Sequence, residues 1–279
     1  MQKILVTTDF SKHSKAGLRF AIQIATQMDA ELVFYHCFQA LIPTTIHGEN
    51  IKNSLEEQSG AKLKQLEKFV SGVYHAMKVA PGACRFVVVE DLNPEKAILD
   101  YVQKNAFDFI CISTRGAGGL GKIIGTNTGG IMRKSPVPVL AVPSAYRVRE
   151  VKKILYASDL ENIEGEMPTV SKLARSMNLK ADMAHFFHLN ELKPDPKTLT
   201  DSWRQKYERL NRVYLERLEG NFAVQLDELI NKVKPSIVVF FTHANQNWFD
   251  RIFAVSRSEA FSFITKAPML VCRKGYVKS

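Results

Sequence analysis

The sequence of 279 residues has no hydrophobic run long enough to cross a membrane. Its longest apolar run, Ile237–Phe241, is far shorter than the ~18 residues that a membrane helix needs. The first apolar run begins almost at the N-terminus and no cleavage motif follows it, so we expect no signal peptide. These absences predict a cytoplasmic protein without a membrane partner.

Cysteine is scarce, with only Cys37, Cys84, Cys111 and Cys272 and no CxxC spacing. This count excludes a small fold built on disulfides and argues against a zinc site. Each cysteine lies in or beside an apolar run, which is typical of buried free thiols.

No basic run interleaved with aromatic residues occurs, although the formal net charge is +10. Residues 1–150 carry 18 basic and 13 acidic side chains and residues 151–279 carry 20 and 15, so each half contributes +5. Acidic residues also interrupt the charged segment 201–217, which we interpret as a solvated amphipathic helix. We therefore expect no nucleic-acid partner.

The chain repeats itself with an offset of 150 residues. Residues 3–10 read KILVTTDF and residues 153–160 read KILYASDL. His36 and His185 also fall at matching places, near the end of the second strand expected in each half. Such self-similarity predicts two copies of one structural unit.

The hydrophobic pattern predicts strands that alternate with helices in both halves. Besides the two repeated segments, of which 153–158 is the strand of the second half, the strands are expected at 31–38, 85–90, 107–113, 137–142, 181–188, 213–218, 236–242 and 268–273. Helices are expected at 16–28, 53–72, 94–105, 164–177, 199–210, 221–233 and 248–266, with one more between the glycine-rich loop and the strand at 137–142.

Alternating strands and helices favour parallel sheets covered on both faces. We expect an α/β fold of two tandem doubly wound domains, each with five parallel strands in flavodoxin-like order. The domains would span residues 1–146 and 151–279, joined near 143–150, and would pair as a pseudo-dimer.

A glycine-rich loop at residues 113–130 is the most informative stretch, because it holds seven of the 15 glycines. In a doubly wound sheet, ligands bind beyond the carboxyl ends of the strands where the strand order reverses. With order 3-2-1-4-5, this loop would meet Asp9 there. A phosphate site is favoured by the glycines, by the positive charges of Arg115 and Lys122, and by the hydroxyls of Thr126 and Thr128.

Other interpretations of the loop stay open. It could be a surface turn without a ligand. It does not match a Walker A loop, which ends in Gly-Lys-Ser/Thr, nor a GxGxxG fingerprint, which follows a first strand.

The sequence resembles the universal stress protein family in five segments. These are the opening ILVTTDFS, the histidine at the second strand, STRG, GTNT and PVPVLAV. The resemblance covers both halves and implies a tandem member. Many members bind ATP through Gly, two residues, Gly, nine residues and Gly-Ser or Gly-Thr. Here Ser113 replaces the first glycine, and only eight residues separate Gly116 from Gly125.

The resemblance implies that Asp9 contacts ribose or adenine, that the backbone around Cys37 borders adenine, and that Gly116 and Gly125 hold phosphates. The expected nucleotide-binding residues are Thr7, Asp9, Cys37, Ser113, Arg115, Gly116, Gly125, Thr126 and Asn127. The ligand would be ATP, or AMP or ADP, with magnesium as an open question.

The second domain has no such loop, since bulky Trp248, Phe249 and Phe253 follow its fourth strand. We expect no nucleotide there, and no metal shared by His185 and His188, which point to opposite faces of a strand. No nucleophile elbow occurs, so at most slow ATP hydrolysis is expected.

The sequence thus predicts a stress-response protein that binds an adenine nucleotide in its first domain and acts as a sensor or regulator, with unknown protein partners and homodimer formation as an open possibility. The alternative is a nucleotide-independent interaction protein that uses the aromatic second domain.

Overall fold

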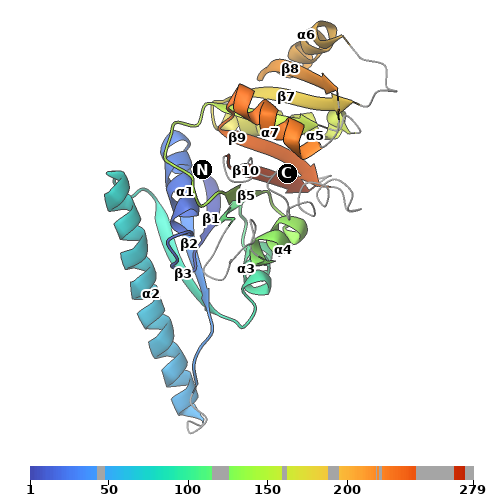
Figure 1. Ribbon diagram of the computed structural model, residues 1–279. Helices are drawn as coiled ribbons and strands as arrows, with labels where there is room; N and C mark the ends of the chain where they lie inside the picture. Colours follow the sequence, from blue (N-terminus) through green and yellow to red (C-terminus); the bar gives the residue numbers. More distant parts are fainter. Residues whose placement is uncertain are drawn as a thin grey trace.

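A computed structural model describes residues 1–42, 48–114, 126–158, 162–187, 195–217, 219, 222–242 and 267–273 (Figure 1). The strands are β1 (Gln2–Thr7), β2 (Ala30–Phe38), β3 (Cys84–Glu90), β4 (Phe109–Ser113), β5 (Val139–Val142), β6 (Lys153–Ser158), β7 (Lys180–Phe187), β8 (Leu210–Arg217), β9 (Ile237–Thr242) and β10 (Met269–Arg273). The helices are α1 (Lys15–Gln27), α2 (Glu49–Met77), α3 (Pro94–Lys104), α4 (Thr126–Lys134), α5 (Ile163–Ser176), α6 (Pro196–Lys206) and α7 (Phe222–Val233).

All ten of these strands form one sheet in the order β3-β2-β1-β4-β5-β10-β9-β6-β7-β8. Strands within each half are parallel, in the flavodoxin-like order 3-2-1-4-5 and its counterpart 5-4-1-2-3. The halves meet where β5 and β10 pair antiparallel, with Leu140 opposite Leu270. The predicted fold class is confirmed, and the two halves join as a pseudo-dimer through their last strands.

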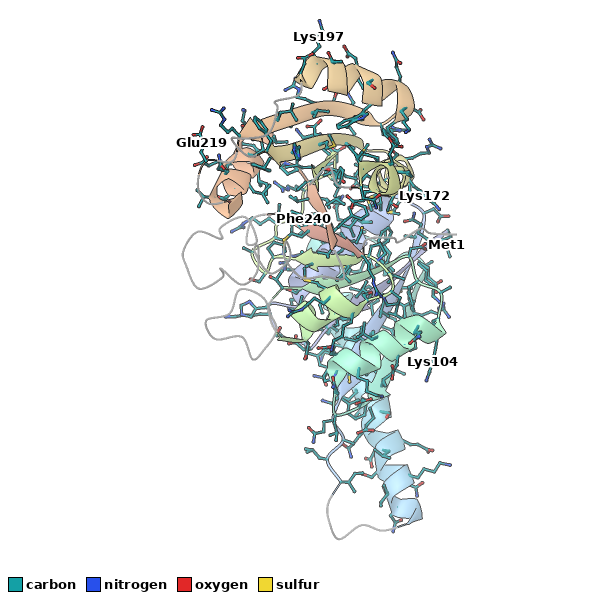
Figure 2. The ribbon with its side chains drawn as sticks, turned by 90° about the vertical axis from the view of Figure 1, so that its right-hand side faces the viewer. Met1, Lys104, Lys172, Lys197, Glu219 and Phe240 are labelled. Carbon is teal, nitrogen blue, oxygen red and sulfur yellow. The ribbon has the colours of Figure 1, made fainter. Side chains whose placement is uncertain are left out.

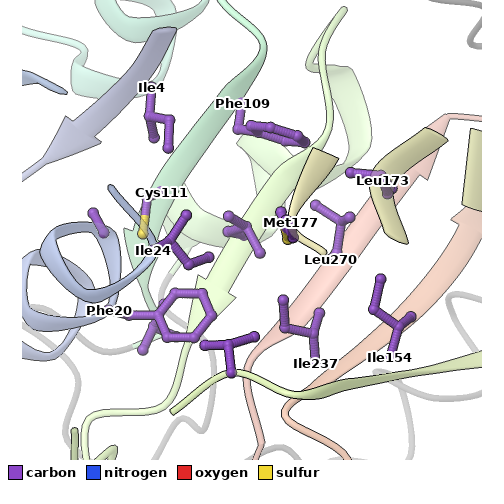
Figure 3. Packing of buried hydrophobic residues seen from close by; sticks show 14 of the residues in the cluster. Ile4, Phe20, Ile24, Phe109, Cys111, Ile154, Leu173, Met177, Ile237 and Leu270 are labelled. Atoms are coloured by element: carbon purple, nitrogen blue, oxygen red, sulfur yellow. The ribbon is translucent and has the colours of Figure 1, made fainter. Parts of the chain in front are cut away.

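Helices cover both faces of the sheet. Buried residues of α1, α2 and α5 form one hydrophobic cluster, and those of α3, α4 and α7 form another on the opposite face. The first cluster runs without a break from Ile4 and Phe20 in the first half to Ile154 and Leu270 in the second (Figure 3). The halves therefore share a core, which favours cooperative folding.

The segment between the halves is held against both of them. The Tyr146 ring packs edge-on against Phe20, with 5.1 Å between centroids. Gln27 exchanges two hydrogen bonds of 3.2 Å with the Val151 backbone. Arg149 donates to the Pro235 carbonyl over 3.2 Å, so this segment fixes the first half to the second.

Two predicted helices differ most clearly in extent. Helix α2 spans Glu49–Met77 rather than 53–72, and α6 ends at Lys206 rather than 210. The latter difference corrects the helical interpretation of 201–217, because Leu210–Arg217 is the edge strand β8. The expected helix 248–266 lies outside the described residues. Among the residues described, no helix is both long and apolar enough to span a bilayer.

Candidate functional site

The strand order reverses between β1 and β4, which are neighbours in the sheet. From β1 the chain proceeds outward through β2 and β3, then crosses back to β4 and β5. Loops after β1 and β4 therefore diverge from one edge, and this is where doubly wound sheets bind ligands. The candidate site is this carboxyl edge of the first half.

The turn after β1 is built by its own hydroxyl groups. Thr8 Oγ1 lies 2.8 Å from Ser14 Oγ and accepts a hydrogen bond from the Phe10 amide, and Ser14 Oγ donates to the Ser11 carbonyl. Phe10 has φ of 61°, in the left-handed region that non-glycine residues rarely adopt. The Asp9 carboxylate accepts from the Ser11 amide over 3.0 Å and is exposed, so the turn presents Asp9 at the edge.

Two side-chain hydrogen bonds hold three segments together at this edge. Ser113 Oγ lies 2.9 Å from the His13 carbonyl and 3.3 Å from the Val142 carbonyl, to either of which it can donate. Thr128 Oγ1 donates to the Ser113 carbonyl over 3.1 Å. The first turn of α4, the end of β4 and the turn after β1 are thus neighbours.

The N-terminal turn of α4 suits an anion. Its first residues are Thr126, Asn127 and Thr128, and no acidic residue lies in that turn. The first amides of a helix have no partner within the helix, and the helix dipole adds partial positive charge there. Asn127 is exposed beside them. This turn can therefore donate hydrogen bonds to a phosphate.

The backbone of Cys37 borders the same edge. Tyr35 accepts a hydrogen bond from the Thr8 amide, and the β1–β2 ladder ends at Tyr35. Because successive residues of a strand direct their backbone groups to opposite sides, the amide and carbonyl of Cys37 point the same way as those of Tyr35. They therefore face the space beyond the end of β1.

The Cys37 side chain points elsewhere. Its Sγ lies 3.5 Å from the Asp91 carbonyl, to which it donates. Burial and the nearby Asp91 carboxylate raise the pKa of the Cys37 thiol to about 11. The thiol therefore stays protonated at neutral pH and is a poor nucleophile.

His36 holds the turn after β1 in place. Its Nδ1 lies 2.8 Å from the Thr8 carbonyl, and its ring lies 4.0 Å from that of Phe10. Burial and the charge of Lys62 lower the pKa of His36, although the Thr8 carbonyl and Asp9 oppose them. A neutral imidazole that donates from Nδ1 holds Thr8, and with it the turn that carries Asp9.

The predicted site residues divide into three groups. Thr7 and Ser113 are buried strand ends, whereas Asp9, the Cys37 backbone and Asn127 face the edge. Arg115, Gly116 and Gly125 lie outside the described residues, and Thr126 begins α4. The hydrogen bonds of Ser113 and Ser14 within the scaffold were not foreseen, because hydroxyl residues near a turn carry no signal that tells support from binding.

The second half repeats the histidine support of the first half. His185 Nδ1 lies 3.2 Å from the Ser158 carbonyl, as His36 does from Thr8. Asp159 and the segment after β9 lie outside the described residues. Within the described part of the chain, no group of three or more His, Cys, Asp or Glu is placed to hold a metal ion.

Comparison with known proteins agrees with this architecture. A universal stress protein from Archaeoglobus fulgidus DSM 4304 superposes with a TM-score of 0.67 at 15% identity, covering 98% of this chain and 96% of that one. A protein assigned to the same family from Pseudomonas aeruginosa UCBPP-PA14 gives 0.59 at 14% identity, covering 99% and 94%. No curated protein matches the sequence. The model of the universal stress protein family matches residues 1–143, and the chain belongs to that family.

Proposed function

We propose that the first half binds an adenine nucleotide at the carboxyl edge of β1, β2 and β4, and that the protein acts as a sensor or regulator in a stress response. The observation that carries this proposal is the convergence of Asp9, the Cys37 backbone and the N-terminal turn of α4 at one edge. These groups differ in chemistry, and each suits a different part of a nucleotide.

The Cys37 amide and carbonyl form a donor beside an acceptor, which complements the donor and acceptor on the Watson–Crick edge of adenine. An exposed carboxylate such as that of Asp9 accepts hydrogen bonds from ribose hydroxyls. The α4 turn, without acidic residues, suits phosphates. By the family resemblance, Gly116, Gly125 and Thr126 would also contact the phosphates, and ATP, ADP and AMP remain candidates.

A thermal-shift titration tests this proposal, with Mg-ATP compared against ATP in chelator, AMP and GTP. A ligand at 100 times its Kd stabilises the folded state by about 2.7 kcal/mol. For a protein of 279 residues, Tm should rise by roughly 5 °C. We expect a saturable rise with ATP and a smaller one with GTP, because guanine reverses the donor and acceptor order of adenine.

Asp9→Ala and Gly125→Val should each weaken nucleotide binding. Asp29→Ala is the matched control, because Asp29 is an exposed aspartate at the amino edge of the same sheet. Unchanged affinity in both Asp9→Ala and Gly125→Val would refute the site. No shift at millimolar ATP would favour the nucleotide-independent interaction protein instead.

A further inference from the structure

Helix α2 extends well past the body of the molecule (Figures 1 and 2). Its buried side chains, Leu66, Val70, Val73 and Tyr74, all belong to its C-terminal half. None of the residues described between 50 and 65 is buried. Half of the longest helix therefore lies outside the hydrophobic core of the first half.

The projecting part is an ordered unit. Gln58 accepts a hydrogen bond from the Leu41 amide and donates one to the Leu41 carbonyl, each of 3.0 Å. It also donates to Ser54 over 3.1 Å. These bonds fix the chain that leaves β2 against α2, and we name residues 41–42 and 50–62 the arm.

The arm carries apolar side chains that no core accommodates. Leu41 is 78% exposed and Ile42 40%, and the two are adjacent. Ile51 and Leu55, four residues apart on one face of α2, are only partly buried. All four are missing from both core clusters of the described residues.

An isolated helix of a few turns is marginal in water, and a cluster of exposed apolar side chains marks an interaction surface. In the part of the second half that the structure describes, α6, the helix between β7 and β8, has 11 residues against 29 in α2. The projecting half of α2 is therefore a feature in which the first half differs from the described part of the second.

Charges beside the apolar face identify the partner. Lys52 and Glu56 lie one turn apart on the same flank, and their side chains are 80% and 69% exposed, with 3.9 Å between Nζ and Oε1. If a second arm packs antiparallel about a two-fold axis near Ser54, Lys52 of each chain faces Glu56 of the other. A parallel arrangement would instead place like charges together.

We propose that two copies of this chain associate through antiparallel packing of their arms. Leu41, Ile42, Ile51 and Leu55 of both chains form the apolar centre, and Lys52 and Glu56 pair across the axis. The apolar centre supplies most of the affinity, because exposed ion pairs contribute little. The charges fix the direction of packing, as complementary charges do in helix pairs.

Sedimentation velocity over a series of protein concentrations tests the apolar centre. Leu41→Asp and Ile51→Asp should each raise the dimer Kd about a hundredfold. In a two-fold symmetric dimer each substitution occurs in both chains, and each copy should raise the Kd about tenfold. Leu92→Asp is the matched control, since Leu92 is 75% exposed but lies outside the arm. A monomer at every concentration, or equal sensitivity to Leu92→Asp, would overturn the proposal.

Exchanging the charges tests the antiparallel direction without disturbing the core. Lys52→Glu and Glu56→Lys should each weaken self-association, because each brings like charges together. An equimolar mixture of these two variants should form a heterodimer, and the double variant should recover the homodimer. A dimer Kd that is unchanged by all of these charge exchanges would refute the antiparallel arrangement.

Discussion

The two halves share one strand order but pack their first helix on the sheet by different means. In the first half a Cβ at Gly17 would lie 3.2 Å from the Ser113 amide nitrogen, so α1 approaches the end of β4 closely. Cys111 Sγ donates to the Gly17 carbonyl over 3.4 Å. At the offset of 150 residues the second half has Met167, which is buried.

In the second half, a buried polar contact joins the corresponding helix to the sheet. The Tyr156 hydroxyl of β6 donates to the Glu166 carboxylate of α5, and both residues are buried. At the same offset the first half has Val6 and Ala16, which are buried and apolar. One topology thus accommodates either a helix in contact with the backbone or a helix held by a buried polar pair, and only the former brings α1 against the candidate site.

Gly17→Met would impose the residue of the second half on the first, and we expect the largest effect. Even a Cβ meets backbone atoms of Ser113 and Ile112 at 3.2–3.4 Å, and backbone cannot move aside as a side chain can. Overpacking of this kind costs about 3 kcal/mol. Urea unfolding measures the loss in the free energy of unfolding.

Gly72→Met provides the control for this change. Gly72 is an exposed glycine of α2, and a Cβ there meets no atom within 4 Å. Loss of a helical glycine should stabilise that variant by up to about 1 kcal/mol. Equal free energies of unfolding for the two variants would contradict the close approach of α1 to β4.

Tyr156→Phe addresses the buried pair of the second half. It removes a hydroxyl that donates to a buried carboxylate, and such a loss costs about 1–3 kcal/mol. Tyr146→Phe is the control, because the Tyr146 hydroxyl lies 3.5 Å from the Arg149 carbonyl, at the limit of a hydrogen bond. A destabilisation no greater than that of Tyr146→Phe would show that the pair contributes nothing net to stability.

Most of the fold could be predicted because buried strands leave a strong signal. The segment 153–158 was predicted as a strand with the bounds that the structure shows, since apolar residues occupy its centre and polar residues follow it in the sequence. The end of α6 was missed because Trp203, Tyr207 and Leu210 continue a helical spacing. Leu210 instead pairs with Ala181 of β7, a tertiary contact that local pattern cannot reveal.

The N-terminal extension of α2 was missed for a related reason. Ile51 and Leu55 keep the helical spacing, but the polar residues Gly48, Glu49 and Asn50 before them favour a loop, so the helix was expected to begin at residue 53. At the candidate site, the flavodoxin-like strand order was expected from the alternation of strands and helices, and the meeting of β1 and β4 followed from that order. The side on which each hydroxyl points did not follow, because whether Ser113 faces a ligand or the His13 carbonyl depends on the packing of α1.

The smallest effect that we predict is a pH dependence of stability that arises from His36. His185 makes the matching contact in the second half. Burial lowers the pKa of His36 below its ordinary value of 6.5, so the folded state keeps the ring neutral where the unfolded state takes up a proton. The contribution of His36 to the free energy of unfolding is therefore complete above a pH of about 6.5, and it decreases as the pH falls through that value. From about pH 7.5 to about pH 5.5 the wild type should lose more unfolding free energy than His36→Gln does.

Unfolding curves at both pH values measure this difference, and other titrating groups cancel when the two proteins are compared. An identical loss in the wild type and His36→Gln would mean that the ring titrates alike in both states. In that case His36 would stabilise the turn that carries Asp9 through its hydrogen bond to the Thr8 carbonyl and not through the neutrality of its ring.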